Sequence, residues 1–427
     1  MTLNRTTVPS IKNIETFSFP PFEVQTLSND IPLHFLNKGS EEVVRIDLMV
    51  SAGKWQQTKP LVSSFTSLML KEGAGQMTGK EIAEQLDFYG AWLQLSDGYH
   101  HSYLTVYTLN KFFKETIDLL MLMFREPAFS EDALNNIKNR RKQQFLIDME
   151  KVQYLSNRGF SKMLFGENHP YGKSAQLEDF DAITTEDLKQ FHQSHYHTNN
   201  LQIILSGKVT DSMIRYCDSV CSVSTCSPPL HSEDAASLEY RNKSEKRLHI
   251  EKEGAVQNGI RMGLPVVNRL HPDFPGLRVL NTILGGYFGS RLMSNIREDK
   301  GYTYGISSGI ASLKEAAYLS IATQSASEHT EPLIKEVYHE IDRLQNEPVP
   351  EQELEMVRNY MLGDFVRSLD GTFSLTEAYL SLLATNMDVN FLHKQVNAVK
   401  NINPHELTEL ALRYLDKDTF IEVVAGQ

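Results

Sequence analysis

The sequence Leu134-Asn-Asn-Ile-Lys-Asn-Arg140, followed by Phe145-Leu146, has a counterpart in the second half of the chain. Leu354-Glu-Met-Val-Arg-Asn-Tyr360, followed by Phe365-Val366, repeats its leucine, apolar, asparagine and phenylalanine positions at a constant offset of 220 residues. A long internal period of this kind is typical of a duplicated structural unit. The fold is therefore predicted to consist of two related halves.

The order of the predicted elements agrees with a duplication. Glu126-Pro127 corresponds to Glu347-Pro348, and Tyr89-Gly90 corresponds loosely to Lys300-Gly301. Hydrophobic periodicity predicts strands, two helices, a hairpin, a long helix, a proline-marked turn and a further helix in each half. We therefore predict an α+β fold of two homologous domains, each a mostly antiparallel sheet covered by helices on one face.

Length and composition set the domain boundaries and the cell compartment. A chain of 427 residues exceeds one typical hydrophobic core, and the polar, aperiodic stretch near its middle suits a linker. The predicted domains are residues 1–222 and 244–427, joined by a linker at 223–243. No apolar run is long enough for a signal peptide or a membrane span, so a soluble, cytoplasmic protein with no membrane partner is expected.

Charge and cysteine content exclude further classes. The net charge of −12, without a basic stripe, argues against a nucleic-acid partner. The three cysteines, Cys217, Cys221 and Cys226, are too few and too irregularly spaced for a disulfide framework or a zinc finger. We expect them to be buried or inert thiols.

The stretch Pro60-Leu-Val-Ser-Ser-Phe-Thr-Ser-Leu-Met-Leu-Lys-Glu-Gly73 is predicted to be a helix packed on the core. Its apolar residues recur at steps of three and four, which is the spacing of a buried helical stripe. Its polar positions carry only hydroxyls, which neither hold a divalent cation strongly nor take up a proton near neutral pH.

Two other groups of residues are candidates for a binding site. His192, His195 and His197 are close enough in sequence to gather zinc, although a polar helix end, where histidine suits the helix dipole, is the favoured alternative. Gly285, Gly286 and Gly289 lie in a glycine-rich turn without the Gly-Lys-Ser/Thr of a phosphate loop. These glycines are expected to permit a close helix-to-helix approach or a mobile segment.

Arg297 and Tyr304 follow that turn and are predicted to face one cleft, from a helix end and a strand start. A guanidinium and a phenol together hold a peptide carbonyl or carboxylate by directed hydrogen bonds. From the residues alone, a surface arginine and a hairpin tyrosine are the alternative.

Several short segments, which are specific only together, resemble the pitrilysin/insulinase family of metallopeptidases. This family includes mitochondrial processing peptidase and bacterial two-subunit peptidases, and the resemblance extends from Phe22 to the C-terminus. The segments are Met69-Leu-Lys-Glu-Gly73, Phe88-Tyr-Gly-Ala91, Pro127-Ala-Phe-Ser130, Asn168-His-Pro-Tyr-Gly172, Tyr196 with Asn199-Asn200-Leu201, Ser206-Gly207, and above all Gly285 to Tyr304.

Active members of the family carry an inverted zinc motif, His-x-x-Glu-His, and a further glutamate about 75 residues later. Aligning Met69-Leu70 with the residues that follow this motif places Ser64, Ser67 and Leu68 on the two zinc ligands and the general base. Gln144 and Phe145 stand 76 and 77 residues after Leu68, so the third ligand is also missing. No zinc is expected in this chain.

The resemblance therefore implies the inactive subunit of a two-subunit zinc peptidase. Arg297 and Tyr304 match the arginine and tyrosine with which such a subunit binds substrate near its partner's zinc. Gly285, Gly286 and Gly289 match the glycine-rich loop that faces the partner. The expected partners are peptide substrates and a homologous subunit that carries His-x-x-Glu-His and the zinc, and a homodimer is the alternative assembly for the chain alone.

Two rival functions stay open from the sequence. One is a scaffold or assembly protein that keeps the fold for docking. The other is a self-sufficient enzyme with a site such as His192, His195 and His197. Retention of both Arg297 and Tyr304 favours the peptidase partner over the scaffold.

Overall fold

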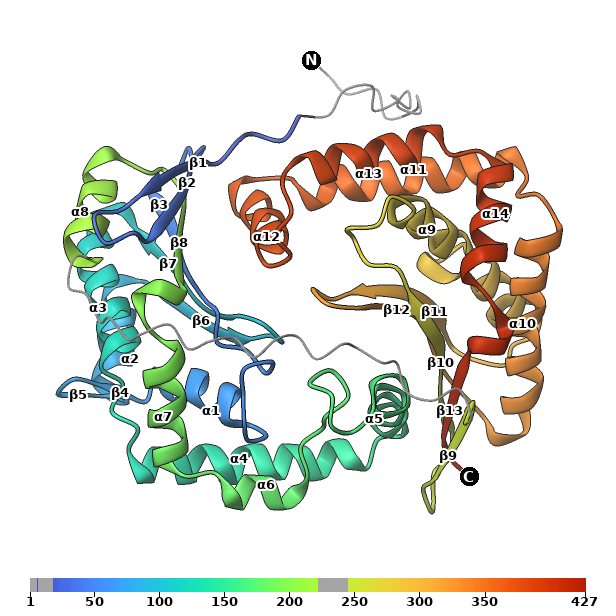
Figure 1. Ribbon diagram of the computed structural model, residues 1–427, viewed down its shortest axis with the longest axis horizontal. Coiled ribbons are helices and arrows are strands. Elements are labelled where there is room, and N and C mark those ends of the chain that lie inside the picture. Colours follow the sequence, from blue (N-terminus) through green and yellow to red (C-terminus); the bar gives the residue numbers. More distant parts are fainter. Residues whose placement is uncertain (1–5, 7–17, 222–244) are drawn as a thin grey trace.

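The computed structural model describes residue 6, residues 18–221 and residues 245–427. The predicted linker at 223–243 and Cys226 lie outside these ranges. Figure 1 shows two halves that face each other, one formed by the first described segment and the other by the second. In the described part of the chain, no helix is both long and apolar enough to cross a bilayer.

Each half contains one main sheet. The first is six-stranded in the order β1-β2-β8-β3-β7-β6, and the second is five-stranded in the order β11-β12-β10-β13-β9. The strands of the first sheet are β1 (Glu23–Thr26), β2 (Pro32–Asn37), β3 (Val43–Val50), β6 (Trp92–Asp97), β7 (Ser102–Leu109) and β8 (Leu201–Gly207). Those of the second are β9 (Arg247–Glu251), β10 (Asn258–Val266), β11 (Ile306–Ser312), β12 (Ala317–Ser325) and β13 (Ile421–Gly426). A separate small hairpin joins β4 (Gly73–Ala74) to β5 (Met77–Thr78).

The two sheets share one topology, which confirms the predicted fold of two related α+β halves. The order β2-β8-β3-β7-β6 corresponds strand for strand to β9-β13-β10-β12-β11. The pairs β2-β8 and β13-β9 are parallel and occupy the same place, whereas the other pairs are antiparallel. The loosely matched Gly90 and Gly301 also adopt the same left-handed backbone, with φ of 60° and 67°.

Helices fill the rest of each half. In the first half they are α1 (Val62–Met69), α2 (Gly79–Tyr89), α3 (Phe113–Arg125), α4 (Glu131–Met149), α5 (Val152–Phe165), α6 (Leu177–Ala182), α7 (Thr185–His195) and α8 (Asp211–Cys221). In the second they are α9 (Phe274–Asn281), α10 (Thr330–Asn346), α11 (Glu351–Ser368), α12 (Thr372–Leu383), α13 (Asn390–Asn401) and α14 (Pro404–Tyr414). Two π-helical segments, η3 (Thr282–Gly286) and η4 (Met293–Asp299), lie between α9 and β11.

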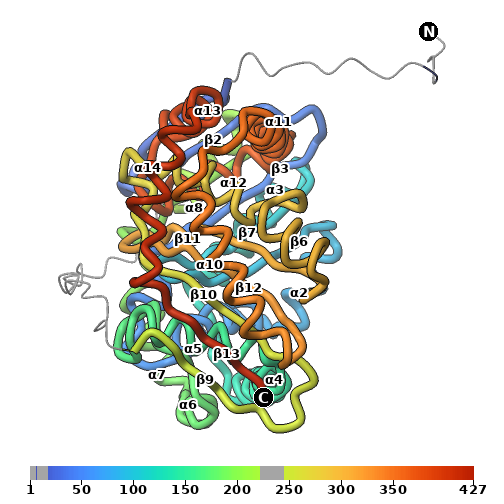
Figure 2. The backbone as a smooth tube through the Cα atoms, turned by 90° about the vertical axis from the view of Figure 1, so that its right-hand side faces the viewer, coloured from blue at the N-terminus to red at the C-terminus, as the bar shows by residue number. Residues whose placement is uncertain are grey.

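The predicted helix starts at Ser130 and Thr184 are confirmed. The Ser130 hydroxyl accepts a bond from the Ala133 amide, and Thr184 forms a capping box with Asp187. Such caps satisfy amides that have no partner within the helix. In Figure 2 the second half faces the viewer, and α10 and α14 lie over its outer surface.

One helix from each half packs on the sheet of the other. From the first half, α5 places Phe160 so close to β10 that a Cβ on Gly263 would lie 2.9 Å from its ring. From the second half, α12 stacks Tyr379 on Phe22, with ring centres 3.9 Å apart. The prediction that helices cover one face only is therefore wrong, because each sheet also buries apolar side chains of its inner face against the opposite half.

A buried ionic network joins α12 to the inner face of the first sheet. Arg45 of β3 forms two 2.7 Å bonds to Asp47, and the pair is 2% and 0% exposed. The Arg45 guanidinium also contacts Glu377 of α12 at 2.6 Å and donates to the Tyr107 hydroxyl at 3.1 Å. The Thr105 hydroxyl donates to Asp47 at 2.6 Å. These contacts fix the position of α12 against β3 and β7.

Candidate functional site

Helix α1 carries the three residues that the resemblance places on the zinc motif. It spans Val62–Met69, shorter than the predicted 60–73, because Leu61 adopts a left-handed backbone with φ of 72° at its start. The Ser64 hydroxyl donates to the Leu61 carbonyl at 3.2 Å, and Ser67 is buried. The Leu68 side chain has no atom that could bind a metal, and it packs against the core of the first half.

Aromatic side chains occupy the surroundings of α1. Phe65 of α1 contacts Phe180 of α6, and Phe180 contacts Phe145 of α4, with ring centres 6.2 and 5.3 Å apart. Gln144 instead donates to Asp148 along the surface of α4. Zinc requires thiolate, imidazole or carboxylate ligands. The hydroxyls and phenyl rings around α1 do not fit it, and the described residues contain no cluster of three His, Cys, Asp or Glu that does.

The three histidines near the end of α7 do not form a three-residue metal cluster in the described part of the chain. The Nε2 atom of His192 lies 2.8 Å from the Phe124 carbonyl, and its ring stacks on Tyr196. His195 packs on Phe191, and burial, together with the charge of the nearby His197, lowers its pKa to about 4. These contacts support a structural role for His192 and His195 over a metal site, and burial also lowers the pKa of His192, so neither ring carries the charge that would suit the helix dipole at neutral pH.

The described cysteines are buried and free. Cys217 and Cys221 lie on the inner side of α8, and neither forms a disulfide. Burial raises the pKa of Cys221 to about 11 and also raises that of Cys217. Both are therefore protonated and unreactive at neutral pH, as predicted.

Gly285 of the glycine-rich turn approaches a strand, so this glycine does not serve the predicted close approach between helices, although Tyr287 of the same turn contacts Tyr360 of α11, with ring centres 5.0 Å apart. A Cβ on Gly285 would lie 2.6 Å from the Ser308 hydroxyl and 2.8 Å from its backbone nitrogen, so only glycine lets η3 pack on β11. Gly286 ends η3, and a Cβ on Gly289 would lie 2.9 Å from the Tyr287 ring. The turn is consequently held against the second sheet.

Arg297 lies in η4, beside this turn. Its guanidinium carbon is 4.7 Å from the ring centre of Phe288, between Gly286 and Gly289. Its contact with the Glu298 carboxylate is long, at 4.0 Å. Asn295 of the same segment donates to Glu340 of α10 at 2.7 Å and anchors η4. The structure thus brings Arg297 to the glycine-rich turn and leaves most of its donors available.

Tyr304 projects from the turn before β11, and its side chain is 92% exposed. Its neighbours are fixed, because the Thr323 hydroxyl of β12 bonds both the Thr303 hydroxyl and the Gly305 carbonyl at 2.9 Å. Among the described residues no hydrogen bond joins Tyr304 to Arg297. The two side chains therefore belong to one short segment, 297–304, and are not hydrogen-bonded to each other.

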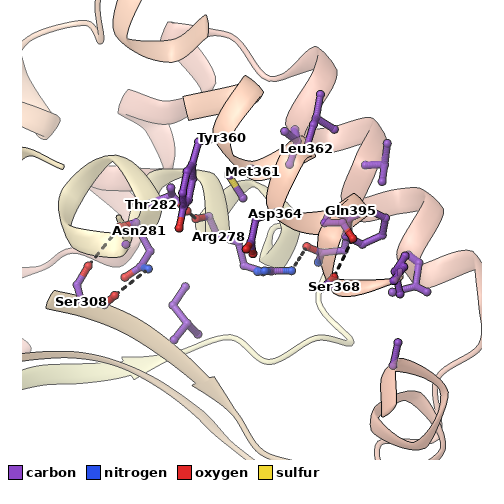
Figure 3. A pocket seen from close by; sticks show the side chains of 18 residues that line it. Arg278, Asn281, Thr282, Ser308, Tyr360, Met361, Leu362, Asp364, Ser368 and Gln395 are labelled. Atoms are coloured by element: carbon purple, nitrogen blue, oxygen red, sulfur yellow. Dashed lines mark hydrogen bonds between the residues drawn. The ribbon is translucent and has the colours of Figure 1, made fainter. Parts of the chain in front are cut away.

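A cavity of about 370 Å³ opens behind the glycine-rich turn, between α9, α11, α12, α13 and β11. Figure 3 shows Arg278, Asn281 and Gln395 among the polar side chains that line it. Sequence reasoning missed this group, because Arg278 and Gln395 are 117 residues apart and belong to different helices. No spacing or motif links them.

Comparisons with known proteins agree with this architecture. Residues 182–361 match the family model described as the peptidase M16 inactive domain. The chain is similar to a Bacillus subtilis protein named "Uncharacterized zinc protease YmxG", at 23% identity over 82% of this chain and 85% of that protein. It is also similar to a Helicobacter pylori protein named "Non-peptidase homolog YmxG", at 23% identity over 80% and 78% of the two chains.

The fold is shared with a crystal structure of a peptidase M16 inactive domain from Pseudomonas fluorescens. The TM-score is 0.86 at 23% identity, over 95% of this chain and 98% of that one. The chain is therefore similar, over residues 182–361, to the inactive domain of the M16, or pitrilysin-type, peptidase family, and its sequence contains no His-x-x-Glu-His.

Proposed function

We propose that the chain is the non-catalytic, substrate-binding subunit of a heterodimeric zinc metallopeptidase that degrades or processes peptides. A homologous subunit with His-x-x-Glu-His supplies the zinc and the activated water, and this chain supplies Arg297, Tyr304 and one wall of the peptide chamber. The chain has no peptidase activity alone.

The observation that carries the proposal is the state of Tyr304. The backbone of Tyr304 is held between neighbours that are anchored to β12, and its side chain is 92% exposed, with no hydrogen bond to its hydroxyl from the described part of the chain. Arg297, with one long ion pair, has donors left for an external carbonyl. Donors that are fixed before the reaction stabilise negative charge developing on a peptide carbonyl at little reorganisation cost.

An unpaired sheet edge supports the peptide-binding part of the proposal. Strand β6 is the last strand of the first sheet, and its residues alternate between exposed and half-buried. Trp92 stacks on Tyr107 of β7 and is itself exposed. Extended peptides add to such an edge through backbone hydrogen bonds, which tolerates many sequences.

The test combines the purified chain with a homologous subunit that carries the intact motif and measures hydrolysis of a quenched fluorescent peptide. Arg297→Ala and Tyr304→Phe are expected to lower kcat by about 100-fold, the usual effect of removing a preorganised donor. Arg215→Gln, an exposed arginine on α8, is the control and is expected to change nothing.

Sedimentation of each mixture separates chemistry from assembly. The proposal expects the Arg297 and Tyr304 variants to form the same heterodimer as the unmodified chain. A heterodimer that forms and retains full activity with both variants would refute the role of the pair. A heterodimer whose activity does not depend on this chain would support a scaffold instead.

A further inference from the structure

The cavity between α9, α11, α12, α13 and β11 is lined by Arg278, which is exposed to solvent. The Arg278 Nη1 atom donates to the Gln395 Oε1 atom at 2.8 Å. In the described part of the chain, no salt bridge joins Arg278 to a carboxylate. A guanidinium has five N–H donors, so Arg278 has donors left for a ligand in the cavity.

Two amides in the same wall are incompletely bonded. Gln395 is 3% exposed, and because its Oε1 atom accepts from Arg278, its Nε2 atom is left as a buried donor without a partner. Asn281 is 8% exposed and donates to the Ser308 carbonyl, which leaves its Oδ1 atom as a buried acceptor without a partner. Buried polar groups are normally paired, so such orphans point to a ligand.

Charged groups of both signs lie near these donors. Asp364 is the only acid among the described residues that line the cavity; its charge favours the charged form of Arg278, and its Oδ1 atom also accepts from Arg367 at 2.6 Å. Arg269 repels Arg278 electrostatically, and its Nη1 atom bonds to oxygens of Ser381. Because two arginines accompany one acid, an anion beside the exposed Arg278 would offset the repulsion between the arginines.

The rest of the wall mixes hydroxyl and apolar side chains. The hydroxyls belong to Thr282, Ser308, Tyr360 and Ser368, and the apolar side chains include Ile310, Leu362, Leu369, Leu392, Val396 and Val399. The cavity of about 370 Å³ lies within the usual size of small-ligand sites, which combine apolar walls with a few convergent polar groups.

We infer that this cavity binds the C-terminal residue of a peptide when that residue is apolar. The peptide's α-carboxylate accepts hydrogen bonds from Arg278 and from the Gln395 Nε2 atom, and its backbone N–H donates to the Asn281 Oδ1 atom. Its apolar side chain packs against the apolar part of the wall. The acceptor on Asn281 favours an acylated amino acid over a simple fatty acid, which has no N–H to offer.

This inference extends the proposed substrate-binding role, but its test needs only the isolated full chain. The probes are N-acetyl-leucine, its neutral amide and octanoate. Binding is followed through the ¹³C-labelled methyl group of Met361, which lines the cavity and is assigned with a Met361→Leu variant. Failure here leaves the reconstituted peptidase assay unaffected, so the two proposals fail separately.

The expected result is saturable binding of N-acetyl-leucine. The amide should bind at least about tenfold more weakly, since charge-assisted bonds are about twice as strong as neutral ones. Octanoate should also bind at least about tenfold more weakly, because it has no N–H to donate to the Asn281 Oδ1 atom. Arg278→Gln is expected to abolish carboxylate selectivity, and Arg215→Gln is expected to preserve it. Gln395→Glu, nearly isosteric, places a competing carboxylate beside Arg278 and provides a second variant if Arg278→Gln does not fold.

Three outcomes would overturn the inference. The first is no shift of the Met361 methyl signal with any probe. The second is equal binding of N-acetyl-leucine and its amide, which would exclude a carboxylate site. The third is octanoate binding as tight as that of N-acetyl-leucine, which would assign the cavity to free carboxylic acids and not to peptide ends.

Discussion

Breaking the ionic network between β3 and α12 should destabilise the protein strongly. Asp47→Ala leaves the guanidinium of Arg45, which is 2% exposed, without the buried carboxylate that accepts two of its hydrogen bonds. Removing one member of a buried ion pair costs about 3–5 kcal/mol. Arg45 keeps Glu377 at 2.6 Å and Tyr107 at 3.1 Å, so the lower end, about 3 kcal/mol, is expected. Glu377→Ala should cost about 1 kcal/mol or less, because the Glu377 side chain is 66% exposed.

A double-mutant cycle tests the physical reason. Arg45→Met with Asp47→Leu replaces both charges by apolar groups, and such replacements are often neutral or stabilising. The double variant should therefore be more stable than either Asp47→Leu or Arg45→Met. Glu84→Ala, which removes an exposed i,i+4 pair with Lys80, is the surface control and should cost less than about 0.5 kcal/mol.

Urea unfolding followed by tryptophan fluorescence reports on the half that contains the network, because Trp55 and Trp92 are the only tryptophans and both belong to the first half. The midpoint should fall clearly for Asp47→Ala and recover in the double variant. If the effects of Asp47→Leu and Arg45→Met simply add, the two residues do not form an interacting buried pair and the reasoning is refuted.

Further predictions concern the glycine-rich turn and the histidines. Gly285→Ala should lower the free energy of unfolding by about 1–3 kcal/mol, because its Cβ would overpack against the Ser308 backbone. Gly309→Ala on β11, with nothing within 4 Å of its Cβ, should be nearly neutral. Thermal unfolding of both variants measures this, and equal effects would contradict the packing argument. Burial and the charge of Lys314 lower the pKa of His101 to about 4, below the 6.5 of the unfolded chain. The unfolded state then binds more protons between these values, so the stability that His101 contributes is complete above pH 6.5 and is lost as the pH falls toward 4. His101→Gln should flatten this pH dependence in urea titrations at pH 7 and pH 5, and an unchanged slope would show that His101 titrates normally.

Local sequence patterns predicted much of each half. Strand β8 occupies the predicted residues Leu201 to Gly207, and the caps at Ser130 and Thr184 lie where hydroxyl and acidic side chains predicted helix starts. These features depend on neighbours within a few residues, which a sequence displays directly. The duplication was also predictable, because one register of 220 residues relates α4 to α11.

The packing of α5 and α12 on the sheet of the opposite half was not predictable in the same way, and neither was the cavity. The contact of α12 with the first sheet joins Tyr379 to Phe22 and Glu377 to Arg45, residues more than 300 positions apart. The hydrophobic periodicity of α12 predicts that one of its faces is buried, but it does not predict which sheet covers that face. The π-helical turns η3 and η4 have no sequence signature beyond Gly285 and Gly286 of η3. The missing zinc ligands were evident from the sequence, but the packing of Phe180 between Phe65 and Phe145 was not.

The proposed role of this chain is to contribute substrate-binding groups to a zinc peptidase whose metal belongs to another subunit. The most direct measurement is a titration of a His-x-x-Glu-His subunit with this chain, with the rate of zinc-dependent peptide hydrolysis as the readout. The account predicts little activity from either protein alone and a rate that rises to saturation at one copy of each. Zinc-dependent hydrolysis by this chain alone, or a rate that does not change as the chain is added, would contradict it.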